Sequence, residues 1–152
     1  MLPATATRVR QNTADEVNRR IEAQIDRNVY FFADHPDEIG HRLDELDQEW
    51  DIERALEANA AALAFAGVLL GAIDRRLLAL PALVTGFLLQ HALQGWCPPV
   101  PFFRRRGFRT EAEIDRERYA LKAVRGDFRV VAEPGKAGAR RRADMALDAV
   151  RA

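Results

Sequence analysis

Apolar residues recur with helical spacing before residue 57, and they predict two amphipathic helices. Those of the first helix recur at every fourth position: Val17, Ile21, Ile25 and Val29. Those of the second, which follows a break at residues 34–36, recur at spacings of four, three and four: Ile39, Leu43, Leu46 and Trp50. Each series places its members on one helix face. Thr13 followed by Glu16 is a capping-box pattern that would open the first helix.

Two long uncharged stretches follow and predict a helical hairpin. Residues 58–73 and 77–96 carry no formal charge, and only the three charged residues 74–76 separate them. At about 1.5 Å per residue these stretches extend roughly 24 and 30 Å as helices, close to a ~30 Å hydrocarbon core. We therefore expect a two-span transmembrane hairpin. Asn59 and Pro81 interrupt the apolar pattern, so a buried hairpin of a soluble helical bundle remains the alternative.

The rest of the chain predicts one more helix and a tail. Thr110 and Glu113 form a second capping box, and the helix that they open should end near Gly126. We expect an all-α protein in which amphipathic cytoplasmic helices flank the hairpin. Its expected parts are an N-terminal helical region (1–55), the hairpin (56–103), a C-terminal helix (104–128) and a flexible basic tail (129–152) that holds at most a short helix near residues 143–150.

The net charge of zero conceals a segregated charge pattern. Residues 1–57 carry a net charge of −7, residues 58–103 of +1, and residues 104–152 of +6. These acidic and basic blocks could pair within one chain or between subunits. Arginines crowd the exit of the second apolar stretch, so the positive-inside rule places that side and both termini in the cytoplasm. The predicted membrane-interface residues are Trp96, Arg104, Arg105 and Arg106.

Small and polar residues within the hairpin suggest how its helices pack. Gly67 and Gly71 form a G-x-x-x-G pattern, which lets another helix backbone approach closely. We expect it to pack on the second helix, with Gly86 on the opposing small face, and association into a homodimer is the less favoured alternative. His91 belongs to a polar cluster late in the second helix, and we expect it to form interhelical hydrogen bonds or to contact lipid headgroups.

Cys97 is the single cysteine, and it is the candidate reactive thiol. The sequence reveals no acid partner for a Cys–His arrangement, so a small buried side chain is the favoured interpretation. We expect no enzymatic activity, no catalytic residue, no metal ligand set and no cofactor. Aromatic residues do not alternate with the basic clusters as in a nucleic-acid-binding motif, so no nucleic-acid partner is expected.

The hairpin that ends in Gly95-Trp96-Cys97-Pro98 and is followed by Gly107 resembles a bacterial inner-membrane family. This YgaP-like transmembrane domain is a two-helix unit that is sometimes fused to a rhodanese domain. The resemblance covers roughly residues 56–108. It implies a bacterial inner-membrane location, a helical dimer, and sulfane-sulfur chemistry on a rhodanese cysteine. This chain has no second cysteine for that role, so a separate rhodanese-type protein would have to supply it.

Three functions are consistent with these observations. The leading hypothesis is a small integral inner-membrane protein that acts as a non-enzymatic anchor or interaction module in the lipid bilayer. The second is a thiol or persulfide carrier that uses Cys97 together with a separate sulfurtransferase. The third is a soluble helical adaptor, which requires that the hairpin is not inserted in a membrane.

Overall fold

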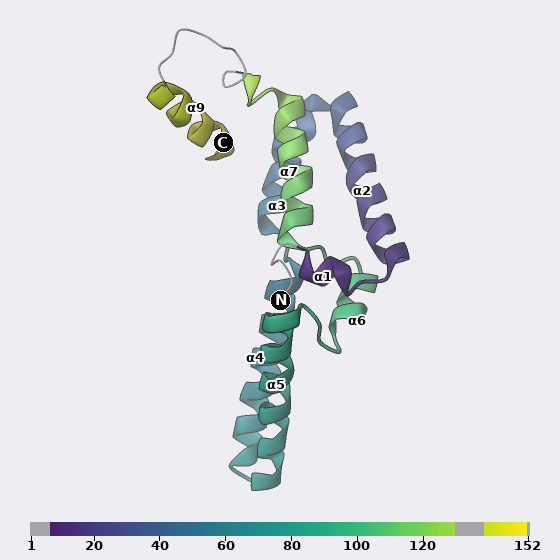
Figure 1. Ribbon diagram of the computed structural model, residues 1–152, viewed down its shortest axis with the longest axis vertical. Helices are drawn as coiled ribbons and strands as arrows, with labels where there is room; N and C mark the ends of the chain where they lie inside the picture. The colour runs from purple at the N-terminus through teal and green to yellow at the C-terminus, as the bar shows by residue number, and fades with distance from the viewer. Residues whose placement is uncertain (1–6, 130–138, 152) are drawn as a thin grey trace. The chain divides into compact units, whose positions relative to one another are not determined.

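The computed structural model describes residues 7–129 and 139–151, and this part of the chain is all-helical without a strand (Figure 1). The predicted all-α class is therefore confirmed for these residues. Internal contacts divide the chain into two units. The first, here the hairpin unit, comprises Met1–Gln24 and Glu49–Ile114, and the second, here the flanking unit, comprises Ile25–Gln48 and Asp115–Ala152.

Within the described residues, the hairpin unit comprises five complete helices and the starts of two others, α2 and α7. In chain order they are α1 (Arg8–Gln11), the start of α2 (Asp15–Asp34), α4 (Ile52–Gly71), η2 (Arg75–Leu78), α5 (Ala79–Gln94), α6 (Val100–Arg105) and the start of α7 (Glu111–Arg125). The Asp51 carboxylate caps α4 by accepting from the Arg54 N–H at 2.6 Å. Helix α4 therefore begins before the first uncharged stretch, α5 begins two residues after the start of the second, and each helix ends two residues before the end of its stretch.

Glycines allow α4 and η2–α5 to pack closely in the antiparallel pair. A Cβ added to Gly67 would lie 2.6 Å from Cδ of Pro81, and one added to Gly71 would overlap the side chain of Leu78. Both glycines therefore lie at the contact between the two helices of one chain. The prediction that Gly86 forms the opposing small face is wrong, because no atom lies within 4 Å of a Cβ added to Gly86. Pro81 and Leu78 lie against Gly67 and Gly71 instead.

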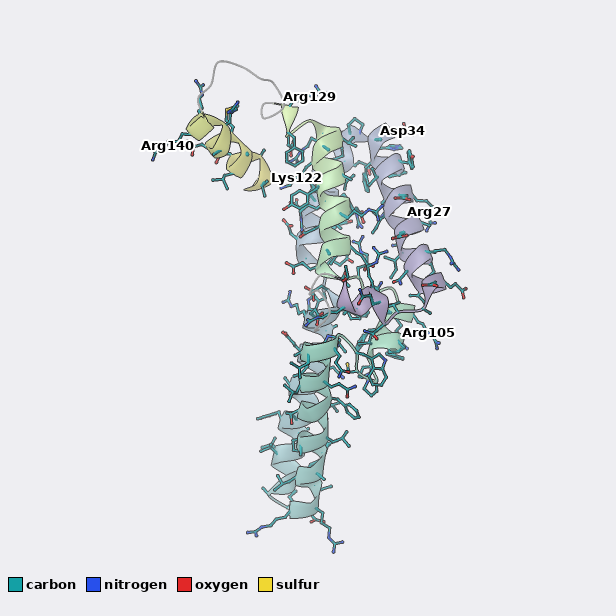
Figure 2. All side chains as sticks on the ribbon, viewed as in Figure 1. Arg27, Asp34, Arg105, Lys122, Arg129 and Arg140 are labelled. Atoms are coloured by element: carbon teal, nitrogen blue, oxygen red, sulfur yellow. The ribbon has the colours of Figure 1, made fainter. Side chains whose placement is uncertain are left out.

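Most of the hairpin's apolar surface has no partner within the described residues. Two helical stretches, Pro36–Gly71 and Arg75–Gln94, contain segments long and apolar enough to cross a membrane. Only 28% and 6% of those segments are buried. In Figure 2 the side chains along α4 and α5 are almost entirely carbon, and nitrogen atoms reappear at the closed end of the pair. The core helices of a soluble protein are mostly buried, so the low burial is the unusual feature of this hairpin.

The flanking unit consists of the rest of α2, η1 (Pro36–Glu38), α3 (Ile39–Gln48), the rest of α7, and α9 (Ala139–Arg151). Its buried apolar side chains come from α2, α3, α7 and α9: Ile25, Ile39, Leu43, Leu46, Leu121 and Ala149. Most of the predicted stripe is thus buried. Trp50 was wrongly included in it, because α3 ends at Gln48 and the indole is 47% exposed.

The beginning and end of α7 follow the sequence prediction. The Thr110 N–H donates to Oε2 of Glu113 at 2.8 Å, and the Glu113 N–H donates to Oγ1 of Thr110, which completes the capping box. Gly126, at φ +94°, follows the last residue of the helix. Thr13 does not form the expected capping box. Its hydroxyl donates to the carbonyl of Val9 instead.

The expected flexible tail contains a longer helix than predicted. Helix α9 covers Ala139–Arg151, where at most a short helix was expected. The Lys122 ammonium donates to the carbonyl of Val150 at 2.8 Å, which ties α9 to α7. Residues 130–138 of the predicted tail lie outside the described residues.

Candidate functional site

Cys97 lies in the apolar core of the hairpin unit, just beyond the end of α5. Its side chain is 4% exposed and packs in a cluster with Val9, Ile52, Leu56 and Val100. These partners come from α1, α4 and α6, so three helices enclose the thiol. The expectation of a small buried residue agrees with this position, and the groups around the sulfur determine what else it can do.

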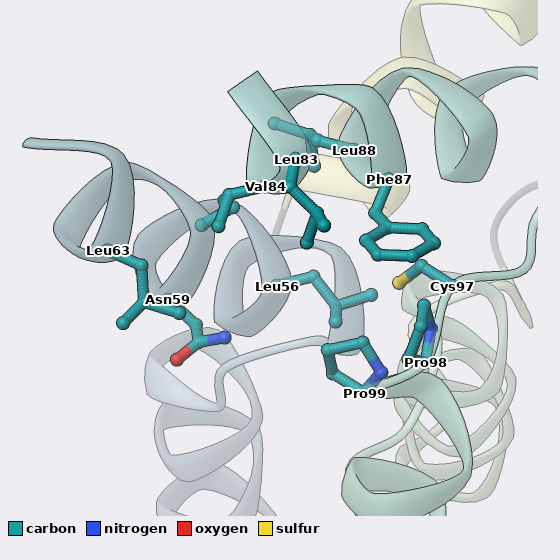
Figure 3. A pocket seen from close by; sticks show the side chains of 11 residues that line it. Leu56, Asn59, Leu63, Leu83, Val84, Phe87, Leu88, Cys97, Pro98 and Pro99 are labelled. Atoms are coloured by element: carbon teal, nitrogen blue, oxygen red, sulfur yellow. The ribbon is translucent and has the colours of Figure 1, made fainter. Parts of the chain in front are cut away.

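A cavity of about 240 Å³ lies between α4, α5 and the segment that carries Cys97. Its lining is almost wholly apolar: Leu56, Asn59, Ala60, Leu63, Leu83, Val84, Phe87, Leu88, Cys97, Pro98 and Pro99. In Figure 3 the sulfur of Cys97 lies between the ring of Phe87 and the side chain of Leu56. The cavity is open to the outside, whereas the Cys97 side chain itself is buried.

His91, near the end of α5, binds a carboxylate that the sequence did not reveal. The imidazole is 3% exposed, and its Nε2 lies 2.6 Å from Oε2 of Glu53. Nδ1 of His91 is buried and has no hydrogen-bond partner within the described residues. Glu53 is therefore an acid partner of His91 that the sequence did not indicate.

Arg8 holds this arrangement in place from α1, and Gly95 at the end of α5 leaves room for it. Arg8 Nη2 donates to Oε1 of Glu53 at 3.1 Å, and Nη1 donates to the carbonyl of Ala92 at 2.8 Å. The second bond satisfies a carbonyl at the end of α5, where the helix offers no partner of its own. Gly95, at φ +74°, is required here because an added Cβ would lie 2.5 Å from Cβ of Arg8. The glycine of the Gly95-Trp96-Cys97-Pro98 motif thus permits α1 to approach.

The geometry defines a chemical order among these groups. An ionised carboxylate only accepts hydrogen bonds, so the ring proton of His91 that faces Glu53 resides on Nε2. In the neutral imidazole Nδ1 then carries a lone pair and can accept a proton. The site therefore combines a buried thiol at an apolar cavity with an imidazole that a carboxylate orients.

Arg104 is not at a membrane interface, which corrects the sequence prediction. Its side chain is fully buried and its guanidinium forms a bidentate pair with Glu113 at 2.7 and 2.8 Å. It also donates to Oδ1 of Asn18, to Oγ1 of Thr13 and to the carbonyl of Phe108. All five N–H donors of the guanidinium are used within the protein.

This network sets the ionisation of Glu113. Burial alone would raise the pKa of its carboxyl group, but hydrogen bonds from Arg104 and from the Thr110 N–H hold the pKa below the ordinary 4.5. The pair therefore remains ionised inside the protein. Its role is to join α6 to the start of α7 and to the residues before α2.

The other predicted interface residues do lie at the surface. Arg105 and Arg106 are exposed, and Trp96 is 36% exposed. The Arg106 guanidinium stacks over the ring of Phe102 at 4.4 Å, and Phe102 is itself half exposed. This gives α6 a surface that combines aromatic and cationic groups.

Sequence reasoning overlooked Glu53 and Arg8 for different reasons. In an antiparallel hairpin, residues equally far from the turn face each other, so His91 should lie opposite the segment that contains Glu53 and Glu57. That signal was available in the sequence. The position of Arg8 was not predictable, because α1 has only four residues and no repeating pattern.

Within the described residues, no group of three His, Cys, Asp or Glu side chains is arranged to hold a metal ion. Comparisons of the chain with protein-family models, with curated proteins and with solved structures found no match.

Proposed function

We propose that this protein is a bacterial inner-membrane anchor whose α4–α5 hairpin crosses the lipid bilayer twice and holds its flanking helices at the cytoplasmic surface. As an anchor and interaction module it requires no catalytic step. The observation that carries the proposal is the exposure of apolar side chains around the whole hairpin.

That exposure of apolar side chains is unfavourable in water and favourable in lipid. Exposed side chains include Phe65 at 67%, Leu69 at 56%, Ile73 at 84% and Leu89 at 62%. Each apolar side chain left in water forfeits about 1.5–3 kcal/mol of burial free energy. A soluble adaptor would need a partner protein over nearly the whole length of both helices. A bilayer covers the same surface without a specific partner, which favours the membrane proposal.

The surface beside the hairpin fits a membrane interface. Trp96, Phe102 and the exposed Arg105 and Arg106 combine aromatic groups with positive charge. Tryptophan and tyrosine collect at the headgroup level, and arginines favour the cytoplasmic side. The buried Arg104 is not part of this belt.

The partners of such an anchor follow from the resemblance to the YgaP-like family. A homodimer and a separate rhodanese-type protein are the two candidates that it suggests. Gly67 and Gly71 are already occupied by the hairpin's own second helix, so a dimer would have to use another face.

A second candidate function is a thiol carrier that uses Cys97, and the cavity that this residue lines favours it. This function requires that Cys97 of the folded protein reacts with iodoacetamide faster than an ordinary buried thiol. A slow reaction of Cys97 with iodoacetamide would contradict the thiol-carrier function.

The membrane proposal is tested by a charged substitution at an exposed apolar position. Phe65→Lys should reduce retention of the expressed protein in carbonate-washed membranes, because a lysine at the centre of a span costs roughly 2.5–3.5 kcal/mol on insertion scales. Tyr119→Lys is the matched control, since Tyr119 is a 40% exposed aromatic residue on α7. It should leave retention unchanged.

The opposite result would overturn the proposal. If the unmodified protein leaves the membrane in carbonate, or is soluble without detergent, the hairpin is not integral. Equal behaviour of both lysine variants would mean that Phe65 faces water in the native protein, where such a substitution changes stability by about 0.5 kcal/mol or less.

A further inference from the structure

We propose that a hollow between the start of α2 and the end of α6 binds the headgroup of an anionic phospholipid, with Arg19, Arg20 and Arg105 as its phosphate ligands. This inference rests on the proposed function, because it requires that the hairpin lies in a lipid bilayer. It adds a defined lipid site to the anchor.

The hollow belongs to the hairpin unit and has a volume of about 600 Å³. Its lining consists of Glu16, Val17, Arg19 and Arg20 from α2 and of Arg105 from α6. Three arginines against one glutamate give this lining a net charge of +2. All four charged side chains are exposed, so a ligand can reach them without a change in the fold. In Figure 2 Arg105 lies where α6 meets the first turns of α2.

Buried contacts fix the two walls of the hollow. On α6 the fully buried Arg104 donates to Oδ1 of Asn18 on α2 at 3.0 Å. Arg105 follows Arg104 in the chain, and Arg19 follows Asn18. The Arg20 guanidinium also donates to the carbonyl of Arg105 at 2.6 Å, which satisfies a carbonyl in the last turn of α6. The exposed arginines are therefore held together by neighbours that cannot move apart independently.

Two of the three arginines have unused donors. Within the described residues, the guanidinium groups of Arg19 and Arg105 form neither an ion pair nor a hydrogen bond, and the acidic residues in the first turn of α2 do not pair with them. By contrast, Arg8 and Arg104 of the same unit both bind carboxylates. The N–H groups of a guanidinium match two oxygens of one phosphate. Unpaired guanidinium groups on both walls can therefore hold a phosphate between them.

The residues beside the hollow favour a phospholipid over a free phosphate ion. Phe102, one turn before Arg105 on α6, is 53% exposed, and the Arg106 guanidinium stacks over its ring at 4.4 Å. Trp96 is exposed shortly before α6. Aromatic and cationic side chains combine in this way at the boundary between headgroups and acyl chains. A phospholipid bound at Arg105 can contact these groups and the exposed apolar side chains of the hairpin, whereas a free phosphate ion cannot.

The charge of the hollow favours anionic headgroups over zwitterionic ones. Phosphatidylcholine carries a cationic amine beside its phosphate, and the positively charged lining repels that amine. Cardiolipin carries a pair of phosphates and no amine, so its charge is complementary to the lining. Basic pockets at the cytoplasmic ends of membrane helices suit such headgroups. Cardiolipin is therefore the probe that fits the hollow best.

The experiment measures lipid binding to the full chain in detergent micelles by native mass spectrometry. We expect one tightly bound cardiolipin per chain, and binding of phosphatidylcholine that is weaker by about tenfold or more. Excess inorganic phosphate should leave the cardiolipin adduct in place. Displacement of cardiolipin by inorganic phosphate would assign the hollow to a free phosphate ion and overturn the lipid site.

The site itself is tested by the double variant Arg19→Gln/Arg105→Gln. Each arginine beside an anionic lipid contributes a factor of roughly five, so cardiolipin binding should weaken by about 30-fold. Helical circular dichroism should match the parent, because both side chains are exposed. Arg27→Gln/Arg141→Gln is the matched control. It removes the same charge from exposed arginines of the flanking unit and should leave cardiolipin binding unchanged.

A charge-conserving variant separates specific phosphate binding from general attraction. Arg19→Lys/Arg105→Lys keeps both positive charges but loses the paired N–H groups that match phosphate oxygens. Cardiolipin binding should weaken by about fivefold, between the parent and the glutamine variant. If the lysine variant binds cardiolipin as tightly as the parent, the two arginines are not phosphate ligands and the proposal is overturned.

Carbonate washing distinguishes failure of the lipid site from failure of the anchor. The glutamine variant should remain in carbonate-washed membranes, because the apolar surface of its hairpin is unchanged. If the parent is retained but the glutamine variant binds cardiolipin equally well, or the control loses binding to the same extent, the lipid site fails and the anchor stands. If carbonate releases the parent, both fail. Loss of a dimer of the chain in the glutamine variant, with lipid binding unchanged, would assign the hollow to acidic side chains of a second copy.

Discussion

At the residue scale, the buried Arg104–Glu113 pair holds together the start of α7, the end of α6 and the residues before α2. An ion pair of this kind stabilises only if both partners keep all their hydrogen bonds, because the desolvation cost per ion is several kcal/mol. Here the guanidinium uses all five donors, and Glu113 also accepts from the N–H of Thr110. The capping box and the ion pair therefore share one carboxylate.

Glu113→Gln should lower the free energy of unfolding by about 3–5 kcal/mol, because it leaves Arg104 buried without a counter-charge. Glu111→Gln is the matched control, since Glu111 lies exposed in the same first turn of α7. It should change stability by less than about 0.5 kcal/mol. Denaturant titration in detergent, followed by helical circular dichroism, gives both values.

The same carboxylate should make stability depend on pH in a defined direction. The folded pKa of Glu113 lies below its ordinary 4.5, so its contribution is fully present above pH 4.5 and is lost as the pH falls through the folded value. Glu113→Gln should flatten this acid-side loss. An equal acid-side loss in both proteins would mean that other carboxylates cause it.

At the element scale, the contact between α4 and α5 depends on which glycines lie against the partner helix. Gly67 faces Pro81, whereas Gly86 faces open space. Both lie within helices, so alanine brings the same intrinsic gain of about 1 kcal/mol in helix propensity at each position. Any difference between the two alanine variants therefore measures the packing between the helices.

Gly67→Ala should weaken the hairpin, and Gly86→Ala should leave it unchanged or stabilise it. The new methyl at position 67 would lie 2.6 Å from Cδ of Pro81, so α5 has to shift away from α4. Two cysteines introduced at facing positions of α4 and α5, in a Cys97→Ser background, report this shift as a slower disulfide cross-linking reaction. Equal cross-linking rates for the two variants would contradict the observed packing.

The helices were largely predictable from sequence, and their contacts were not. Apolar periodicity and the Thr110–Glu113 capping box predicted α2, α3 and α7, because both signals act within a few turns of one helix. The burial of Arg104 and the capping of α5 by α1 depend on residues more than eighty positions apart. Nothing local distinguishes a buried arginine from the exposed Arg105 beside it.

At the scale of the whole molecule, the acidic and basic blocks pair inside each unit. In the hairpin unit Arg109, which is 2% exposed, binds Glu49. In the flanking unit Arg118 binds Asp47 at 2.9 Å. Both pairs join residues of the acidic 1–57 block to residues of the basic 104–152 block. Pairing within one chain therefore accounts for part of the segregation, and salt should weaken the exposed pairs more than the buried one.

The proposed orientation makes a final prediction about the two faces of the membrane. In a Cys97→Ser background, Arg76→Cys should react with a membrane-impermeant maleimide in intact cells. Glu16→Cys and Arg141→Cys should react only after the inner membrane is permeabilised. All three positions are exposed, so a difference in labelling reports the side of the membrane and not burial. The expected pattern follows from the excess of exposed arginines beyond the open end of the hairpin.

Each other labelling pattern has a separate meaning. If all three cysteines react only after permeabilisation, the hairpin does not cross the bilayer and the anchor proposal fails. If Arg76→Cys is protected while the other two react in intact cells, the hairpin crosses in the reverse orientation. In that case the three charged residues of the turn would outweigh the arginines after α5, although only two of those three are basic. The positive-inside rule makes that outcome unfavourable, because the turn then carries the smaller positive charge into the cytoplasm.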